Sequence, residues 1–366
     1  MKFVCQRSEL FEAATHVSYA VASKSNIPAL EGILFKISRE KLFMAGSDME
    51  ISITCSIDIK SDSDFSTVLP GSLFLEMVRK MADDIVTVEI DERLITTIKC
   101  GEAEFNMTGM PADDYPEIPS ISGGAAISLP GDLLKNMIRQ TNFAVAKNDQ
   151  RPIYKGTLFE LNETGIKLVS VDGVRLAIRN ESINCKEDIS FVVPGKSLAQ
   201  VNKLIENDGN VSIAVGKNHI IFEIDGNAVI SKLLDGDFLD YNAAIPVSSA
   251  STVTVNTRTF SEAVERVSLL TSEKLASPIR CIFENNTIKL ACANAIGKAF
   301  DSIPCQFDGE RVEIGFNHIF LLDALRYSEC DEVKLLLNGN LSPMKIVPTD
   351  GDSFLFLILP VRIKNE

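Results

Sequence analysis

The stretch ISLPGDLLKNMIRQTNFAVAKNDQRPIYKGTLF, residues 127–159, carries the pattern that decides the fold. It predicts an amphipathic helix, then a polar loop that ends in a proline, then an apolar strand. The stretch 3–35, FVCQRSELFEAATHVSYAVASKSNIPALEGILF, has the same order at a constant offset of 124 residues, so that Pro28 aligns with Pro152. A third, more diverged version begins at Val253. One unit therefore occurs three times along the chain.

The repeat extends well beyond the helix and its loop. KLFMAGSDMEIS (41–52) aligns with IKLVSVDGVRLA (166–177) and IKLACANAIGKA (288–299), and VLPGSLFLEMVRKM (68–81) aligns with VVPGKSLAQVNKLI (192–205) and EIGFNHIFLLDALRY (313–327). Each unit spans about 120 residues, which is a domain and not a solenoid repeat. We expect three domains, 1–125, 126–250 and 251–366, each large enough to bury its own core.

Each repeat contains two amphipathic helices among short segments in which apolar and polar residues alternate. VTVEI (86–90), VSIAV (211–215) and VKLLL (333–337) show this period of two, which is typical of strands. Roughly eight strands and two helices per repeat predict an α+β domain, with the helices covering one face of antiparallel sheets.

Composition excludes several classes of protein. The 366 residues are 45% hydrophobic and 23% charged, without an apolar run long enough for a membrane span and without a signal peptide at the N-terminus. The eight cysteines form no CxxC pair, so we expect free thiols in a cytoplasmic protein. The net charge of −14 argues against binding nucleic acid by bulk charge, and any basic surface must be local.

The sequence contains no recognisable catalytic constellation. Three histidines lack metal-ligand spacing, and phosphate-binding loops and nucleophile elbows are absent, so we expect neither a cofactor nor a metal. Asp48 and Asp172 could be paired carboxylates of a metal-dependent nuclease. However, they occupy equivalent places in successive repeats, where the third repeat has Asn294. A repeated turn explains this better.

Basic residues gather on the predicted helices. A solvated helix face normally carries charge, and scattered charge is the simpler interpretation. Equivalent helices of three adjoining repeats would nevertheless point the same way and form one basic surface. The residues concerned are Arg79, Lys80, Lys135, Arg139, Lys196, Lys203, Arg258, Arg266 and Arg326.

Over its full length the chain resembles the beta subunit of bacterial DNA polymerase III, the bacterial sliding clamp. The order and spacing of many short motifs carry the resemblance: MKF at the start, IPALEGILF (27–35), GSDMEI (46–51), FNMTGMPADDYP (105–116), FAVAKNDQRPI (143–153), SVDGVRLA (170–177), VVPGKSL (192–198), KLLDGDFLDY (232–241), LLTSEK (269–274), IGFN (314–317) and LPVRI (359–363). The resemblance implies three repeated clamp domains that form half of a closed ring. Two chains would then encircle duplex DNA head to tail as a non-catalytic processivity factor.

The resemblance also implies functional residues. Lys24, Asn148, Arg151 and Lys196 match positions that contact DNA, whereas Ser72 and Pro152-Ile153 depart from the arginine and the tyrosines of some relatives. Phe105, Leu269 and Leu270 match the dimer interface. The matching positions of a peptide-binding pocket are Val171, Gly173, Val174, Arg175, Leu176, Leu239, Asn317, Phe320, Leu341, Leu357, Ile358, Leu359, Pro360, Val361 and Arg362.

The implied partners are double-stranded DNA without sequence preference, a second copy of the chain, and proteins that carry short linear peptides. These proteins would be the replicative polymerase subunit, the clamp-loader ATPase and repair proteins. Val174, Phe320 and the LPVR segment depart from common family residues, which would change peptide preference. The alternatives are an interaction scaffold of the same fold without a DNA role and, less readily, a metal-dependent nuclease.

Overall fold

The computed structural model describes residues 1–82, 85–121, 123–148, 151–185, 187–206, 209–271 and 277–363. Residues 272–274 of the LLTSEK motif lie outside these ranges. The chain forms two compact units, one of residues 1–135 and 196–233, the other of residues 136–195 and 234–366. The division between the units passes through the second repeat.

The three repeats show the expected alternation of strands with two helices each. The first contains β1 (Lys2–Gln6), α1 (Arg7–Ser18), β2 (Gly32–Ile37), β3 (Lys41–Ser47), β4 (Ile51–Asp58), β5 (Lys60–Ser61), β6 (Phe65–Pro70), α2 (Gly71–Lys80), β7 (Ile85–Ile90), β8 (Ile95–Cys100) and β9 (Ala103–Thr108). The second contains β10 (Ala125–Pro130), α3 (Gly131–Asn142), β11 (Gly156–Asn162), β12 (Gly165–Val171), β13 (Arg175–Glu181), β14 (Ile189–Pro194), α4 (Gly195–Leu204), β15 (Asn210–Val215), β16 (His219–Ile224) and β17 (Asn227–Lys232). The third contains β18 (Ser251–Asn256), α5 (Thr257–Ser268), β19 (Ile279–Glu284), β20 (Thr287–Ala293), β21 (Lys298–Pro304), β22 (Gln306–Asp308), β23 (Val312–Phe316), α6 (His318–Ser328), β24 (Glu332–Leu337), β25 (Met344–Pro348) and β26 (Phe354–Ile358).

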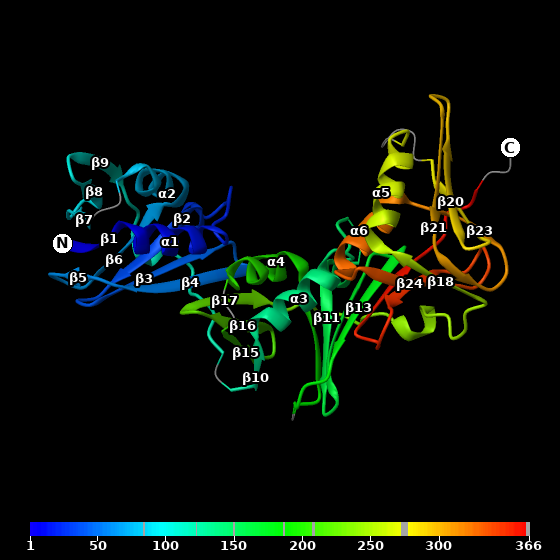
Figure 1. Ribbon diagram of the computed structural model, residues 1–366. Coiled ribbons are helices and arrows are strands. Elements are labelled where there is room, and N and C mark those ends of the chain that lie inside the picture. The colour runs from blue at the N-terminus through cyan, green and yellow to red at the C-terminus, as the bar shows by residue number, and fades with distance from the viewer. Residues whose placement is uncertain are drawn as a thin grey trace. The chain divides into compact units, whose positions relative to one another are not determined.

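The helix starts confirm the repeat. Helices α1, α3 and α5 begin at residues 7, 131 and 257, so their offsets are 124 and 126. Helices α2, α4 and α6 begin at residues 71, 195 and 318, which gives offsets of 124 and 123. In Figure 1, α1 lies beside α2 and α5 beside α6, and both pairs are in contact.

The described strands form four antiparallel sheets, two in each unit. The first unit holds β5-β1-β7-β8-β9 and β10-β15-β16-β17-β4-β3-β2-β6. The second unit holds β14-β11-β12-β13-β26-β25-β24-β18-β22 and β21-β20-β19-β23. The pair β4–β17 joins the first two repeats into one sheet, and the pair β13–β26 joins the last two.

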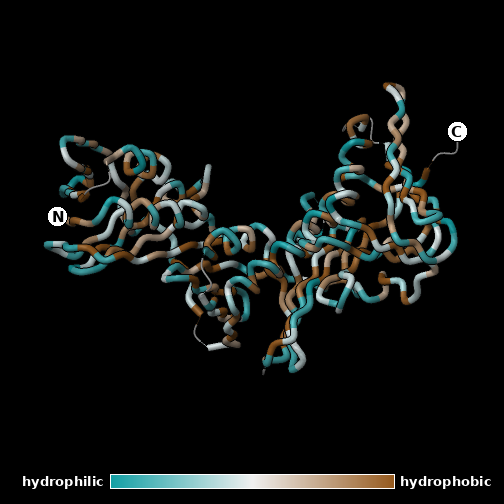
Figure 2. The backbone as a smooth tube through the Cα atoms, viewed as in Figure 1, coloured by the Kyte–Doolittle hydropathy of each residue, from teal (hydrophilic) through white to brown (hydrophobic). Residues whose placement is uncertain are grey.

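Buried apolar residues of the helices and of the sheets that they contact form the cores. Hydrophilic and hydrophobic residues follow one another at short intervals along the backbone in Figure 2. In the first repeat Phe74 of α2 meets Phe35 of β2 edge-on, with ring centroids 5.0 Å apart. The apolar faces of α3 and α4 are buried as expected. Two side chains are exceptions to the usual burial of apolar and exposure of polar residues: Leu73 of α2 is 48% exposed, and Gln140 of α3 is only 4% exposed.

Candidate peptide pocket and nucleic-acid interface

The repeated acidic position is a turn, as predicted. Asp48 Oδ1 accepts the backbone N–H groups of Glu50 and Ile51 at 3.0 and 2.9 Å. Asp172 Oδ1 does the same for residues 174 and 175, and Asn294 Oδ1 for residues 296 and 297. An amide oxygen serves as well as a carboxylate in this turn, which removes the main support for the nuclease alternative. No group of three or more metal-binding side chains occurs among the described residues.

Arg175, at the start of β13, connects the second repeat to the third. Its side chain is 8% exposed and bonds Asp172 Oδ2 through Nε at 2.7 Å and Asp323 Oδ2 through Nη1 at 2.6 Å. The guanidinium also lies 4.7 Å from the ring centre of Phe320 and 5.6 Å from that of Phe143. Asp323 and Phe320 belong to α6, so one buried cation fixes α6 against β13.

Next to Arg175 lies an apolar cavity of about 260 Å³. Eight residues of the predicted pocket line it: Val171, Gly173, Val174, Arg175, Leu176, Leu239, Leu357 and Leu359. The sequence prediction missed Tyr154, Tyr241 and Ala244, and it assigned Arg151 to DNA only. The Arg151 guanidinium lies 4.1 Å from the ring centre of Tyr154, so the two form one wall of the cavity.

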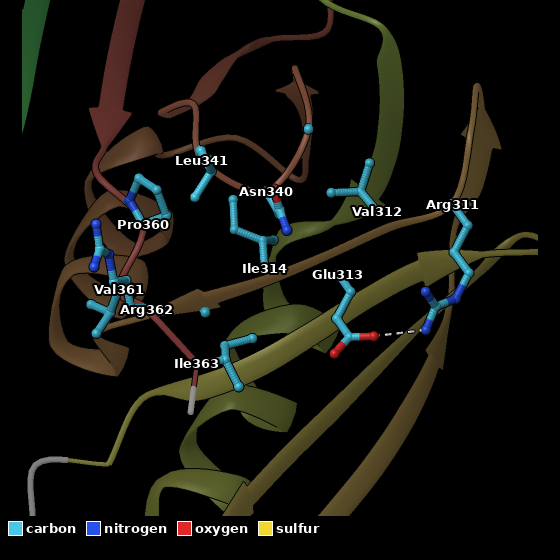
Figure 3. A pocket seen from close by; sticks show the side chains of 12 residues that line it. Arg311, Val312, Glu313, Ile314, Asn340, Leu341, Pro360, Val361, Arg362 and Ile363 are labelled. Atoms are coloured by element: carbon cyan, nitrogen blue, oxygen red, sulfur yellow. Dashed lines mark hydrogen bonds and ion pairs between the residues drawn. The ribbon is translucent and has the colours of Figure 1, made fainter. Parts of the chain in front are cut away.

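Four further predicted pocket residues, Leu341, Pro360, Val361 and Arg362, line a second and larger hollow of about 930 Å³ (Figure 3). The remaining three belong to the lining of neither hollow. Asn317 caps α6 by accepting the N–H of Ile319 at 3.0 Å, Phe320 stacks on Arg175, and Ile358 is buried in the core. The structure therefore divides the predicted pocket into two adjacent hollows and a supporting layer.

Large apolar side chains remain exposed around these hollows. Leu341 is 79% exposed, and Val174, Leu359 and Val361 are between 37% and 42% exposed. A concave apolar surface with exposed aliphatic side chains is typical of a site that binds anchor residues of a peptide.

In the first unit, several predicted DNA-binding cations already have partners. Lys196 forms an ion pair with Asp48, Lys203 Nζ lies 4.9 Å from the ring centre of Tyr19, and Lys135 Nζ donates to the Ile205 carbonyl at 2.6 Å. Burial opposes ionisation of Asp48, but hydrogen bonds from Lys196 and from the turn N–H groups outweigh it and hold the pKa of Asp48 below its ordinary value.

The other predicted DNA-binding residues of this unit lie at the surface. Arg79 pairs with Glu76 at 2.7 Å, and both side chains are more than half exposed. Lys24 and Lys80 are exposed.

In the second unit, the polar face of α3 contacts the end of α6. Arg139 pairs with Glu329 at 2.5 Å, and Gln140 Nε2 donates to the Ser328 carbonyl at 3.2 Å. The third repeat therefore covers Gln140, although glutamine is a polar side chain. Asn148 is exposed.

The predicted interface residues lie near two free sheet edges. Phe105 is half-buried on β9, which ends one sheet of the first unit. Leu269 is 83% exposed, and Leu270 adjoins Gly297, just before the edge strand β21. Ile296 and Phe300 (68% exposed) extend this apolar surface and were missed, although a phenylalanine at an outward position of KAFD was a usable signal.

Comparisons with known proteins agree with this geometry. Family models of the DNA polymerase III beta subunit match residues 1–119 (N-terminal domain), 128–240 (central domain) and 242–362 (C-terminal domain). The beta sliding clamp of Bacillus subtilis is 35% identical, with 99% of this chain and 100% of the relative covered, and that of Halalkalibacterium halodurans is 31% identical, with the same coverage.

Solved structures give the same result. The crystal structure of the DNA polymerase sliding clamp from Bacillus subtilis matches with a TM-score of 0.96 at 33% identity over 100% of both chains. A putative DNA polymerase III beta subunit from Eubacterium rectale matches with a TM-score of 0.94 at 34% identity over 99% of both chains. No helix among the described residues is long and apolar enough to cross a membrane. The chain belongs to the DNA polymerase III beta subunit family, the sliding clamps, which are non-catalytic processivity factors of the polymerase holoenzyme.

Proposed function

We propose that two copies of this chain close head to tail into a ring around duplex DNA and tether a replicative polymerase in the cytoplasm. We also propose that each chain consists of three clamp domains with the limits 1–125, 126–250 and 251–366. The proposed dimer rests on one observation: the edge strands β9 and β21 are equivalent, by the repeat, to strands that pair with each other inside the chain.

The equivalence follows from the strand order. At the first internal junction β4 pairs antiparallel with β17, and at the second β13 pairs antiparallel with β26. The strand of the third repeat that corresponds to β4 and β13 is β21, because the same turn (Asp48, Asp172, Asn294) precedes all three. The strand of the first repeat that corresponds to β17 is β9, since each follows a two-residue hairpin.

The internal junctions also predict the register. Val229 faces Ile53 at the first junction, and Phe356 faces Ala177 at the second. Transferred to the free edges, Phe105 faces Ala299 and Glu104 faces Phe300 of the other chain. Pairing would cover two exposed strand edges and the apolar side chains of Leu269 and Phe300, and two identical contacts close the assembly.

A cysteine pair tests this register. Directly opposed residues of antiparallel strands have Cα atoms about 4.5–5.5 Å apart, which permits a disulfide. The double variant Glu104→Cys/Phe300→Cys should form covalent dimers under mild oxidation, whereas each single variant should not. Light scattering should give a mass near twice 40.1 kDa. A monomer at every concentration from nanomolar to micromolar would overturn the ring.

For DNA, we propose weak, sequence-independent phosphate contacts from the helices, with topology and not affinity retaining the ring. The proposed contact residues are Lys24, Arg79, Lys80, Lys135, Arg139, Asn148, Arg151, Lys196 and Lys203. The exposed pair Lys24→Glu and Lys80→Glu should reduce retention on circular DNA without changing the dimer mass. Equal retention would remove these two positions from the interface.

For protein partners, we propose that the two hollows bind short linear peptides of the polymerase, the loader ATPase and repair proteins. Val174→Glu should abolish polymerase stimulation because it places a charge at the rim of the apolar cavity. Val247→Glu, at a fully exposed valine outside both hollows, is the matched control.

One observation favours the scaffold alternative: Lys196 and Arg139 already form ion pairs within the chain. A scaffold without a DNA role would keep the pocket but not need these cations. Charge reversal at both positions would then leave polymerase stimulation unchanged, whereas the clamp proposal requires it to fall.

A further inference from the structure

Lys196 and Arg139, two of the cations proposed to contact DNA, are each paired with a carboxylate of a neighbouring repeat. Lys196 of α4 binds Asp48, which lies in the turn between β3 and β4 of the first repeat. Arg139 of α3 binds Glu329, which follows α6 of the third repeat, at 2.5 Å. Both cations belong to the second repeat, and each carboxylate comes from one of the two repeats that flank it in the sequence. The same kind of pair therefore occurs at both internal junctions.

In each pair the cation is more exposed than the carboxylate. The side chains of Lys196 and Arg139 are 62% and 48% exposed. Those of Asp48 and Glu329 are only 17% and 27% exposed. A phosphate group can therefore approach either cation from the solvent while the carboxylate stays behind it.

The carboxylate of Asp48 is fixed in place. Its Oδ1 accepts the turn N–H groups of Glu50 and Ile51, which leaves Oδ2 for Lys196. Burial opposes ionisation of Asp48, but the hydrogen bonds from Lys196 and from the turn outweigh it and hold its pKa below the ordinary value, so Asp48 is charged at neutral pH. The lysine has a flexible four-carbon side chain and is the mobile partner of the two.

Glu329 is held in a backbone conformation that few side chains adopt. Its φ of 54° and ψ of 26° lie in the left-handed region, where glycine or asparagine is usual at the end of a helix. Its Oε1 accepts Arg139 at 2.5 Å and its Oε2 accepts Asn136 Nδ2 at 2.8 Å, so α3 holds both oxygens. A glutamate at a place that favours glycine points to a role for the carboxylate itself.

We propose that the carboxylates of Asp48 and Glu329 compete with DNA phosphates for the cations that they bind, and thereby keep the contacts between the helices and DNA weak. This inference rests on the proposed DNA contacts of these cations. A phosphate that takes either cation leaves a fixed carboxylate without its partner, so part of the gain from the new contact is lost. Each contact is then short-lived, which suits a ring that is retained by topology and moves along the duplex. Ion pairs that by themselves favour a scaffold thus become a means of sliding.

Three variants that each remove one negative charge test the proposal. Asp48→Asn keeps the turn, because Asn294 Oδ1 accepts the equivalent N–H groups in the third repeat. Glu329→Gln keeps the size of the side chain. Glu89→Gln is the matched control, since Glu89 pairs with Lys2 at 3.1 Å across the strands β7 and β1 and not on a helix.

Fluorescence anisotropy with a short labelled linear duplex measures binding by the full-length protein at a series of salt concentrations. Asp48→Asn and Glu329→Gln should each lower the Kd about two- to fivefold at low salt, which is the effect of one exposed ion pair. Each should also steepen the slope of log K against log salt concentration by up to about 0.9, because one more cation is free to replace a counterion of DNA. The control should change neither quantity.

A double variant separates competition from a structural role. Combined with Lys196→Met, Asp48→Asn should no longer change the Kd, because no cation remains for the carboxylate to hold. An effect that persists in this background would overturn the inference, as would single variants that bind no more tightly than the parent or a control that gains as much as they do. These outcomes leave the proposed ring on DNA intact as long as the parent binds the duplex. Failure of the parent to bind it would overturn both.

Discussion

Replacing Arg175 by methionine should destabilise the second unit strongly. The substitution leaves the carboxylates of Asp172 and Asp323 facing each other without the cation that both now bond at 2.7 and 2.6 Å. The arginine side chain is 8% exposed, so solvent screens little of this loss. Removing one partner of a buried ionic cluster costs about 3–5 kcal/mol, and we expect about 3 kcal/mol because Asp323 is 26% exposed.

Urea unfolding and thermal melting measure this change. A loss of about 3 kcal/mol corresponds to a fall in Tm of roughly 6–12 °C for a unit of this size. The combination Arg175→Met/Asp172→Asn/Asp323→Leu is the informative partner, since asparagine keeps the turn as Asn294 does in the third repeat. This triple variant should recover most of the loss because no uncompensated charge remains. A single variant within 1 kcal/mol of the parent, or a triple variant no better than the single, would refute the reasoning.

Three further predictions follow from named contacts. Hydrogen bonds keep the folded pKa of Asp48 below its unfolded value, so the stability that Asp48 contributes is present at neutral pH and is lost as the pH falls below about 4. Lys196→Met should therefore flatten the decline of the unfolding free energy between pH 5 and pH 3. An unchanged slope would contradict this. Gly315→Ala should weaken binding of an apolar peptide without lowering the Tm of the first unit. The added Cβ would lie 2.7 Å from the Val361 carbonyl oxygen and displace the terminal segment that separates the two hollows. Unchanged affinity would show that this segment does not shape the site. Gln140→Leu should cost about 1 kcal/mol in urea unfolding, because the Ser328 carbonyl loses its amide donor and keeps only the weak thiol donor of Cys330, and no loss would mean that water replaces the amide there.

The repeat made most of the fold predictable from the sequence. Internal alignment placed the helix starts and identified the turn at Asp48, Asp172 and Asn294 as structural. The alternating strands and the α+β class followed from hydropathy alone. These features are local, and each was observed three times, which lets a single sequence reveal them.

Contacts between repeats were not predictable in the same way. Gln140 bonds a carbonyl 188 residues away, so nothing in its own helix indicates that it is buried. Tyr154 and Ala244 reach the cavity from segments just outside the motifs used to predict it, and Tyr241 is the last residue of one such motif. The exposure of Leu73 likewise depends on what lies beside α2 and not on the helix pattern.

The two internal junctions differ at positions equivalent to those beside the apolar cavity. At the first junction the position equivalent to Arg175 is Ile51, which is buried and faces Ser231 across the sheet. Ser231 in turn donates to Ser197 of α4 at 2.7 Å, so a short polar contact joins strand and helix there.

At the second junction the offset of 123 between α4 and α6 places Phe320 where α4 has Ser197, and Asp323 where it has Gln200. Arg175 connects β13 to α6 by bonding Asp323 and stacking on Phe320. The long side chain holds β13 and α6 together at their edges while leaving the apolar cavity open beside them. The two junctions of this repeated fold thus differ through a few substitutions at equivalent positions, and the same three positions could be exchanged to test whether they suffice to open or close the cavity beside Arg175.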